Sequence, residues 1–243
     1  MMMTNKVALI MGAGDAIGSA IMRGFSEQGL IVCGARRNSE KLAPLVEELR
    51  ATGSSAYAFT CDARKEEAIE ALFAEIEATI GEIDVVVFNV GANVPMSILE
   101  TDSRKFFKIW EMACFAGFLT GREAARIMTK RKCGTIIFTG ATASLKGSAG
   151  FAAFASAKHG LRALAQSMAR ELGPQNIHVA HVVIDAAVDT AWIAENVPDY
   201  AERKVRQGIV DPADLAENYV NLYKQPRNAW TFELDIRPWE EKW

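Results

Sequence analysis

Short runs of β-branched and other apolar residues alternate along this chain with segments of helical periodicity. The runs cover residues 7–11, 30–34, 56–60, 84–88, 135–139 and 178–183. They are apolar at successive positions, which is typical of strands buried on both faces in a parallel sheet. Because strand–helix–strand crossovers are right-handed, regular alternation winds helices onto both faces of one sheet. The order therefore predicts an α/β fold with a doubly wound parallel sheet of the Rossmann type.

The end of the chain adds a seventh strand. Residues 230–236 alternate apolar with polar side chains, the period of a half-buried strand, and Pro238 would end it. With 243 residues and 50% hydrophobic composition the chain can bury a substantial core. No linker, low-complexity tract or internal repeat interrupts it. We expect residues 1–243 to form a single domain, with a substrate-covering segment at about 186–210 and a C-terminal strand and tail at 229–243.

The charge and cysteine content exclude several partners. The formal charge is −3, and scattered lysines and arginines provide no field that would collect nucleic acid or an anionic membrane surface. The four cysteines lack Cys-x-x-Cys spacing, so a reduced cytosol fits best and no metal site is expected. The N-terminus has no signal-peptide pattern, and no run approaches the ~20 apolar residues of a membrane span. We expect a soluble, cytoplasmic protein.

A glycine-rich turn, GAGDAIG, follows the first predicted strand and precedes a helical pattern. Glycines in such a turn let backbone amides approach a pyrophosphate at the positive end of the helix. A tight strand–helix turn that simply needs glycine is the alternative, but a place on the first strand of a doubly wound sheet favours a dinucleotide. Gly12, Gly14, Ile17 and Gly18 are the predicted cofactor-binding residues of this turn.

Two arginines, Arg36 and Arg37, follow the second predicted strand. A site selective for NAD has a carboxylate about 20 residues beyond the glycines to accept the ribose hydroxyls. This chain has Ala35 and then the arginines, whose guanidinium groups match a phosphate. The alternative is a solvated pair that opens a helix. We expect NADP(H) in preference to NAD(H).

Over nearly all of residues 6–236 the chain resembles the short-chain dehydrogenase/reductase family. The glycine turn is similar to the family's Thr-Gly-x-x-x-Gly-x-Gly, with Met11 in place of the threonine and Ala16 in place of the middle glycine. A methyl group at position 16 is a small intrusion. The resemblance implies an oxidoreductase that binds a nicotinamide dinucleotide.

Further patches carry the same resemblance. Asp62, in CDA, would meet the adenine amine, and Asn89 and Gly91, in NVG, match the family's Asn-Ala-Gly. Thr190 is similar to a threonine that follows the sixth strand in the family. Each of these residues could instead be a helix cap or turn residue, since Asp, Asn and Thr serve both roles. Their order at successive strand ends favours the cofactor site.

The catalytic half of the resemblance is incomplete. The family moves a hydride to or from a carbonyl carbon with the help of a tyrosine, a lysine, a serine and an asparagine. The tyrosine and lysine of Tyr-x-x-x-Lys map onto Phe154 and Lys158, the serine onto Ala141 and the asparagine onto Cys114. The one tyrosine that does precede a lysine by four residues, Tyr200 before Lys204, lies beyond the predicted sixth strand and not in the helix before it. The chain resembles a divergent member that keeps only Lys158, the lysine that holds the nicotinamide ribose.

Neighbouring polar residues are poorly aimed to replace the tyrosine. At 100° per residue, Ser156 lies about 160° around the helix from Phe154, and His159 lies about 140° around it. Thr142 should point away from the face that Ala141 occupies, although it or Ser144 could approach if a loop bends.

Two more polar residues lie near the predicted sixth strand. Asp185, near its carboxyl end, is a candidate replacement acid, but a helix-capping or structural role is favoured. His181 lies inside the apolar strand and is expected to be a core residue rather than a base.

These residues lead to two functional hypotheses. The first is an NADP(H)-dependent oxidoreductase with atypical proton chemistry, for example reduction of an activated carbon–carbon double bond, for which water or another residue supplies the proton. The second is a catalytically silent NADP(H)-binding protein that acts as a sensor or as a partner of another protein. Both predict cofactor binding, and they differ in turnover.

The resemblance also implies self-association. In the family the fourth and fifth helices form a dimer interface, and here they would span about 104–131 and 151–172. The tail carries Trp239 and Trp243, which are costly to leave exposed. A homodimer or homotetramer is expected.

Overall fold

The structure, a computed structural model, describes residues 5–91 and 93–241. Within this part of the chain seven strands form one parallel sheet in the order β3-β2-β1-β4-β5-β6-β7. The strands are β1 Lys6–Met11, β2 Ile31–Arg36, β3 Ala56–Thr60, β4 Glu82–Phe88, β5 Gly134–Thr139, β6 Ile177–Ile184 and β7 Glu233–Ile236. The predicted single-domain, doubly wound parallel sheet is confirmed.

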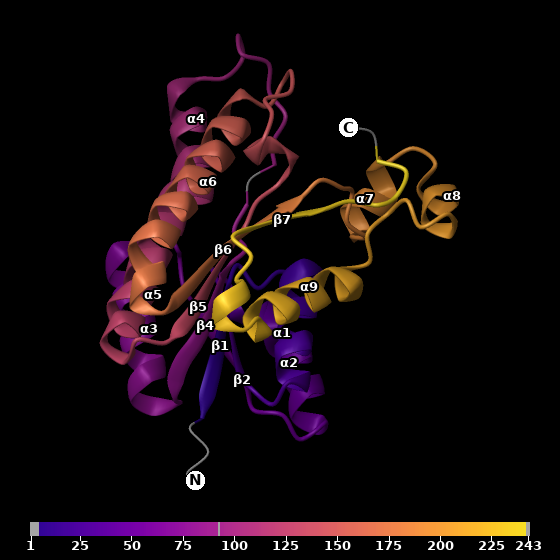
Figure 1. Ribbon diagram of the computed structural model, residues 1–243. Helices are drawn as coiled ribbons and strands as arrows, with labels where there is room; N and C mark the ends of the chain where they lie inside the picture. The colour runs from indigo at the N-terminus through magenta and orange to yellow at the C-terminus, as the bar shows by residue number, and fades with distance from the viewer. Residues whose placement is uncertain (1–4, 92, 242–243) are drawn as a thin grey trace.

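Helices cover both faces of the sheet (Figure 1). The α-helices of the described residues are α1 Ile17–Glu27, α2 Ala43–Ala51, α3 Glu66–Thr79, α4 Ser103–Trp110, α5 Ala116–Arg131, α6 Ala152–Leu172, α7 Ala191–Asn196, α8 Tyr200–Val205 and α9 Pro212–Lys224. One buried cluster joins the sheet to α3, α5 and α6, and a second joins it to α1, α2 and α9.

Side-chain alternation along the strands explains why the runs are apolar at every position. In β1, Val7, Leu9 and Met11 enter the cluster beneath α3, α5 and α6, while Ala8 and Ile10 enter the opposite cluster. Successive side chains of a strand point to opposite faces, and here both faces are covered. Strands of this kind need apolar residues throughout.

The strand order reverses direction between β1 and β4, which lie side by side at the centre of the sheet. Gly12 follows β1 and Asn89 follows β4. The Asn89 N–H donates to the Met11 carbonyl (2.8 Å), and its side-chain amide donates to the Gly12 carbonyl (3.1 Å). Ligands of open α/β sheets bind beyond the strand ends at such a reversal.

The helix expected over 104–131 is interrupted. A π-helical turn, Glu111–Phe115, separates α4 from α5 and contains Cys114. An i→i+5 turn inserts an extra residue into the helical register, and such turns are frequent at functional sites. The alternation pattern of the sequence did not reveal it, because the apolar residues on either side keep helical spacing.

The last strand is shorter than the predicted 230–236. Within residues 230–236, only Glu233–Ile236 forms the ladder with β6. The Trp230 ring stacks on His178, with the ring centroids 5.0 Å apart, and the Thr231 N–H donates to the side chain of Gln225 at 2.7 Å. The ladder with β6 begins at Glu233, and the Phe232 carbonyl just before it accepts the His181 N–H at 2.7 Å.

The segment at about 186–210 contains α7 and α8, which project from the body of the molecule near the C-terminus (Figure 1). The tail contacts it, since the Trp239 indole N–H donates to the Arg206 carbonyl (2.8 Å), yet 75% of Trp239 is exposed. Trp243 lies outside the described residues.

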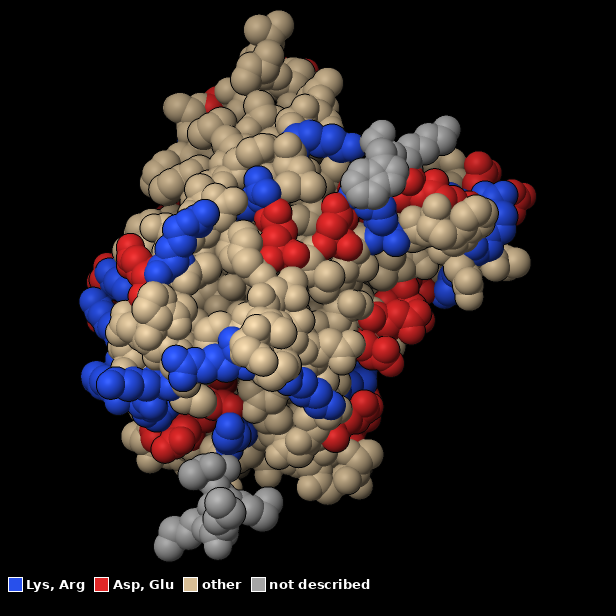
Figure 2. All heavy atoms as spheres, viewed as in Figure 1, with Lys and Arg blue, Asp and Glu red and all other residues tan. Residues whose placement is uncertain are grey.

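The described chain has no helix that is both long and apolar enough to span a bilayer. Cys33, Cys61 and Cys114 are buried free thiols, and Cys133 is exposed. On the face shown in Figure 2, acidic and basic side chains are intermixed.

His181 is fully buried in β6, as expected of a core residue. Its Nδ1 lies 3.0 Å from the Glu233 carboxylate, while Nε2 is without a hydrogen-bond partner in the described structure. Burial lowers the pKa of this imidazole to about 4. The ring is therefore neutral in the folded protein at pH 7 and is not poised as a base.

We predict an acid-dependent loss of stability from this residue. Between pH 6.5 and about 4 the unfolded chain binds a proton at His181 that the folded chain excludes, so stability falls as the pH falls through this window. The loss at this residue should be roughly 2–3 kcal/mol. Urea unfolding of His181→Gln at pH 7 and pH 4.5 should show a smaller difference than the wild type. His159→Gln, an exposed control, should leave the difference unchanged.

Candidate active site

Three cavities meet around Asn89 at the carboxyl ends of the strands, and Asn89 lines all of them. The first, of about 530 Å³, is lined by Arg36, Arg37, Lys41 and Arg64 and is called the arginine cavity. The second, of about 490 Å³, lies around Ala141, Phe154 and Lys158 and is called the Phe154 cavity. The third, of about 1360 Å³, is the α1–α9 groove. The sheet reversal thus gathers most of the predicted site residues.

The backbone of the glycine turn is open at Gly14 and closely packed at Gly12 and Gly18. Gly12 has φ +84°, and a Cβ there would lie 2.8 Å from the Asn89 carbonyl oxygen. A Cβ on Gly18 would lie 2.6 Å from the Ala13 Cα, so the helix packs against the strand end. Gly14 faces open space, its nearest atom being 4.0 Å away. Ala16, with φ −109°, needs no glycine, which explains the departure from the family pattern.

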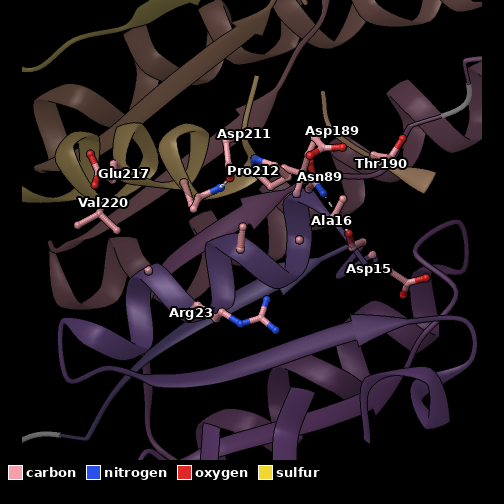
Figure 3. Close-up of a pocket in the computed structure, with 18 of the residues that line it drawn as sticks. Asp15, Ala16, Arg23, Asn89, Asp189, Thr190, Asp211, Pro212, Glu217 and Val220 are labelled. Carbon is pink, nitrogen blue, oxygen red and sulfur yellow. Dashed lines mark hydrogen bonds between the residues drawn. The ribbon is translucent and has the colours of Figure 1, made fainter. Parts of the chain in front are cut away.

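Figure 3 shows the α1–α9 groove from the side of α1. Asp15 and Ala16 lie just before α1, and across the groove Asp211 caps α9, which contains Glu217. Thr190 lies near the glycine turn, where the sequence placed it, and its hydroxyl also accepts the Ile193 N–H at 3.1 Å as the cap of α7. The alternative role, that of a helix cap, is therefore observed, and the contact with a cofactor stays a prediction.

The arginine cavity is strongly cationic. Arg36 forms an ion pair with Asp15 (2.6 Å), and Arg64 holds both oxygens of Asp62 at 2.8 and 2.6 Å. The Arg64 hydrogen bond is the largest cause that lowers the pKa of Asp62. Arg37 is exposed at the mouth. A phosphate bound here would compete with Asp15 for Arg36.

Lys158 is the one charged group in the depth of the Phe154 cavity. Its side chain reaches from α6, is only 3% exposed, and donates to the carbonyls of Thr139 (2.8 Å) and Val90 (3.3 Å). These bonds use two of the three ammonium donors. Burial lowers the pKa of Lys158 to about 8, since no carboxylate compensates the charge.

The other three mapped positions are apolar or turned away. The Phe154 ring centroid lies 5.8 Å from the Lys158 Nζ, and Ala141 shares the cavity wall with it. Cys114 is buried on the π-helical turn behind the cavity, where a Cβ on Gly160 would lie 2.9 Å from its sulfur. No hydroxyl stands at the tyrosine or serine position.

The neighbouring hydroxyl and imidazole groups of α6 do not reach the cavity. Ser156 donates to the Ala153 carbonyl (2.9 Å), and the His159 Nδ1 lies 2.9 Å from the Ala155 carbonyl. Helix geometry predicted both outcomes. Ser144 is fully buried and accepts the Ala141 N–H at 3.1 Å.

Thr142 does line the Phe154 cavity, because the loop after β5 bends. Its hydroxyl donates to Asp185, whose other carboxylate oxygen pairs with Arg237 at 3.3 Å. Asp185 is 6% exposed and is not among the residues that line the cavity. The structure gives Asp185 a structural role, the alternative that the sequence favoured.

Comparison with known proteins identifies the chain by its sequence. Residues 6–201 match the family described as short chain dehydrogenase. The chain belongs to the short-chain dehydrogenase family.

Its relatives and structural neighbours are oxidoreductases of this kind. A short-chain dehydrogenase from Rhodopseudomonas palustris is 50% identical, with a TM-score of 0.84 over 97% of this chain and 99% of that one. The 2,3-dihydro-2,3-dihydroxybenzoate dehydrogenase of Bacillus subtilis is 30% identical over 79% of this chain and 75% of its own length. A metagenomic short-chain oxidoreductase, solved in complex with NADP, is 27% identical with a TM-score of 0.82, and the match covers 97% of both chains.

Several residues that line the cavities of this short-chain dehydrogenase were not predicted from its sequence. Asp15 lies inside the glycine turn and pairs with Arg36. Arg64 lies two residues beyond Asp62 and pairs with it. Neither pair was predicted. Lys41 and Lys146 line cavities although no motif marks them. A search for opposite charges near each predicted site residue would have found the first two.

Among the residues that the structure describes, no group of three or more His, Cys, Asp or Glu side chains is placed to hold a metal ion.

Proposed function

We propose that this short-chain dehydrogenase is an NADP(H)-dependent oxidoreductase that reduces an activated carbon–carbon double bond of a small molecule. The proposal rests on two neighbouring cavities. The arginine cavity is cationic, and in the Phe154 cavity Lys158 is the one group left of the four that the family uses in catalysis.

The arginine cavity supports NADP(H) rather than NAD(H). Arg36 and Arg37 follow the strand that, in an NAD-selective site, would present a carboxylate. Guanidinium groups bind phosphate through charge-assisted hydrogen bonds. A relative with this fold was solved with NADP. The open backbone at Gly14 and the buried Lys158 support a dinucleotide that extends from one cavity to the other.

The Phe154 cavity favours a double bond over a ketone. When bound, NADPH supplies a hydride to one carbon of the double bond and becomes NADP⁺, and a proton adds to the other carbon. Phe154 and Ala141 offer no donor to a ketone oxygen, a loss that costs about 10²–10⁴ in rate for a missing general acid. The third donor of Lys158 can hold the proton or the water that delivers it.

The alternative is a catalytically silent protein that binds NADP(H) as a sensor or as a protein partner. The same apolar positions favour it, since three of the four groups of the family's site are replaced. Turnover separates the two functions.

The test titrates NADPH and NADH into the protein and follows NADPH consumption over aldehydes, ketones and enones. NADPH should bind more tightly than NADH and be consumed with an enone. Tight binding without turnover would support the silent alternative, and absence of NADPH binding would overturn both.

Arg36→Ala should weaken NADPH binding by about tenfold and leave NADH binding nearly unchanged, since one charge-assisted contact to the extra phosphate is lost. Asp15→Asn should tighten NADPH binding a fewfold, because it frees Arg36. Arg170→Ala, an exposed arginine of α6, is the matched control and should change neither affinity.

A further inference from the structure

The charged side chains that line the Phe154 cavity are both lysines. Lys158 lies in its depth and Lys146 at its rim, on the loop after β5. No aspartate or glutamate of the described residues lines this cavity. The neighbouring α1–α9 groove has a mainly acidic lining, with two cations, Arg23 and Lys224, against five carboxylates: Asp15, Glu27, Asp189, Asp211 and Glu217.

Lys146 has no counterion in the part of the chain that the structure describes, where no carboxylate lies within ion-pair distance of its ammonium. Lys204, a lysine on the segment that projects above the groove, differs in this respect, because it pairs with Asp189 at 2.6 Å. The charged lining of the Phe154 cavity is cationic alone, whereas acidic and basic side chains are intermixed on the face shown in Figure 2. An anion is the ligand that this arrangement attracts.

The remaining wall limits the size and polarity of that ligand. Phe151, Phe154, Ile184 and Val188 give the cavity an apolar surface. Its volume of about 490 Å³ has to accommodate the reacting end of a cofactor as well as a substrate. The ligand is therefore small, with an apolar body.

We infer that the substrate is a small carboxylic acid that bears the activated double bond, with its carboxylate paired to Lys146 and its apolar body against Phe151 and Phe154. This inference rests on the proposed function, since it names the substrate class of the same site.

Lys158 gives this arrangement a second consequence. An anion in the cavity favours the ammonium form of Lys158, which burial disfavours. Binding of the acid thus keeps a proton beside the double bond that needs one.

The experiment uses benzoylacrylate as the enone acid, its methyl ester as the uncharged match, and benzoylpropionate as an acid without the double bond. Isothermal titration measures the affinity of benzoylpropionate for the NADP⁺-saturated protein and for the free protein, and NADPH consumption gives KM for the acid and the ester. The variants are Lys146→Gln, Lys146→Arg and the control Lys130→Gln, an exposed lysine at the end of α5.

Lys146→Gln should weaken benzoylpropionate binding and raise the KM for benzoylacrylate by about fivefold, as one partly exposed ion pair is lost. Lys146→Arg should retain the benzoylpropionate affinity and the KM for benzoylacrylate. Lys130→Gln should change neither value, and the KM for the ester should be the same in every variant. Binding of benzoylpropionate that depends on Lys146 without any enone turnover would support the anion site while overturning the proposed reduction. Equal KM values for acid and ester in all variants, or acid binding unaffected by Lys146→Gln, would overturn the inference.

Discussion

Carbonyl reduction should appear when Phe154→Tyr, Ala141→Ser and Cys114→Asn are combined. We expect NADPH-dependent reduction of an aromatic ketone to increase by about 10²–10⁴ over the parent chain, the range associated with a positioned general acid. Phe154 and Ala141 already line the cavity that contains Lys158, so the new hydroxyls would face the substrate. The Lys158 ammonium would lower the pKa of the new phenol, which makes it a better proton donor near neutral pH.

A matched control tests whether position or polarity matters. Phe151→Tyr adds the same hydroxyl to the same cavity wall, but Phe151 is not four residues before Lys158. It should give no carbonyl reduction. The prediction would be contradicted by a triple variant that binds NADPH and has the Tm of the parent chain but reduces no ketone of the panel. That result would show that the cavity no longer positions a carbonyl.

Lys158→Met should abolish enone turnover and stabilise the fold. The variant loses the cavity's buried proton carrier, and we expect NADPH consumption to fall by about 10²–10⁴. In the parent chain, activity should decline as the pH rises through about 8, where Lys158 loses its proton. The pH–rate profile and the turnover of the variant are the measurements. Undiminished turnover in Lys158→Met would exclude Lys158 as the source of the proton.

The stability change follows from the same burial. The pKa of Lys158 is about 8 in the folded protein against 10.5 for the free side chain, so the charged lysine destabilises the fold below pH 8. The parent chain should gain stability as the pH rises from about 8 to 10.5. At pH 7 the variant should be more stable by roughly 2–3 kcal/mol, a rise of several degrees in Tm. Lys130→Met, at an exposed position, should leave Tm unchanged.

The sheet, the glycine turn and the lysine of α6 were predictable because each depends on local pattern. Apolar runs mark strands buried on both faces, and the interval from Phe154 to Lys158 marks one face of a helix. The reversal between β1 and β4 then brings Gly12 and Asn89 together without any further information.

The remaining features depend on contacts between segments distant in sequence. Arg36, at the end of β2, pairs with Asp15 in the loop after β1. Thr142, in the loop after β5, donates to Asp185, which follows β6. Lys146 indicates an anion site only in combination with the rest of the cavity, whose described lining contains no carboxylate. Periodicity contains none of these relations.

The π-helical turn at Glu111–Phe115 bears on how far this chain stands from ordinary ketone chemistry. An inserted residue in a helix is a backbone change that point substitutions seldom create or remove. Here the backbone has this form around Cys114, and α6 packs closely against its sulfur, since a Cβ on Gly160 would lie 2.9 Å from it. The substitutions Phe154→Tyr, Ala141→Ser and Cys114→Asn therefore change side chains alone, on a backbone that needs no insertion or deletion to receive them.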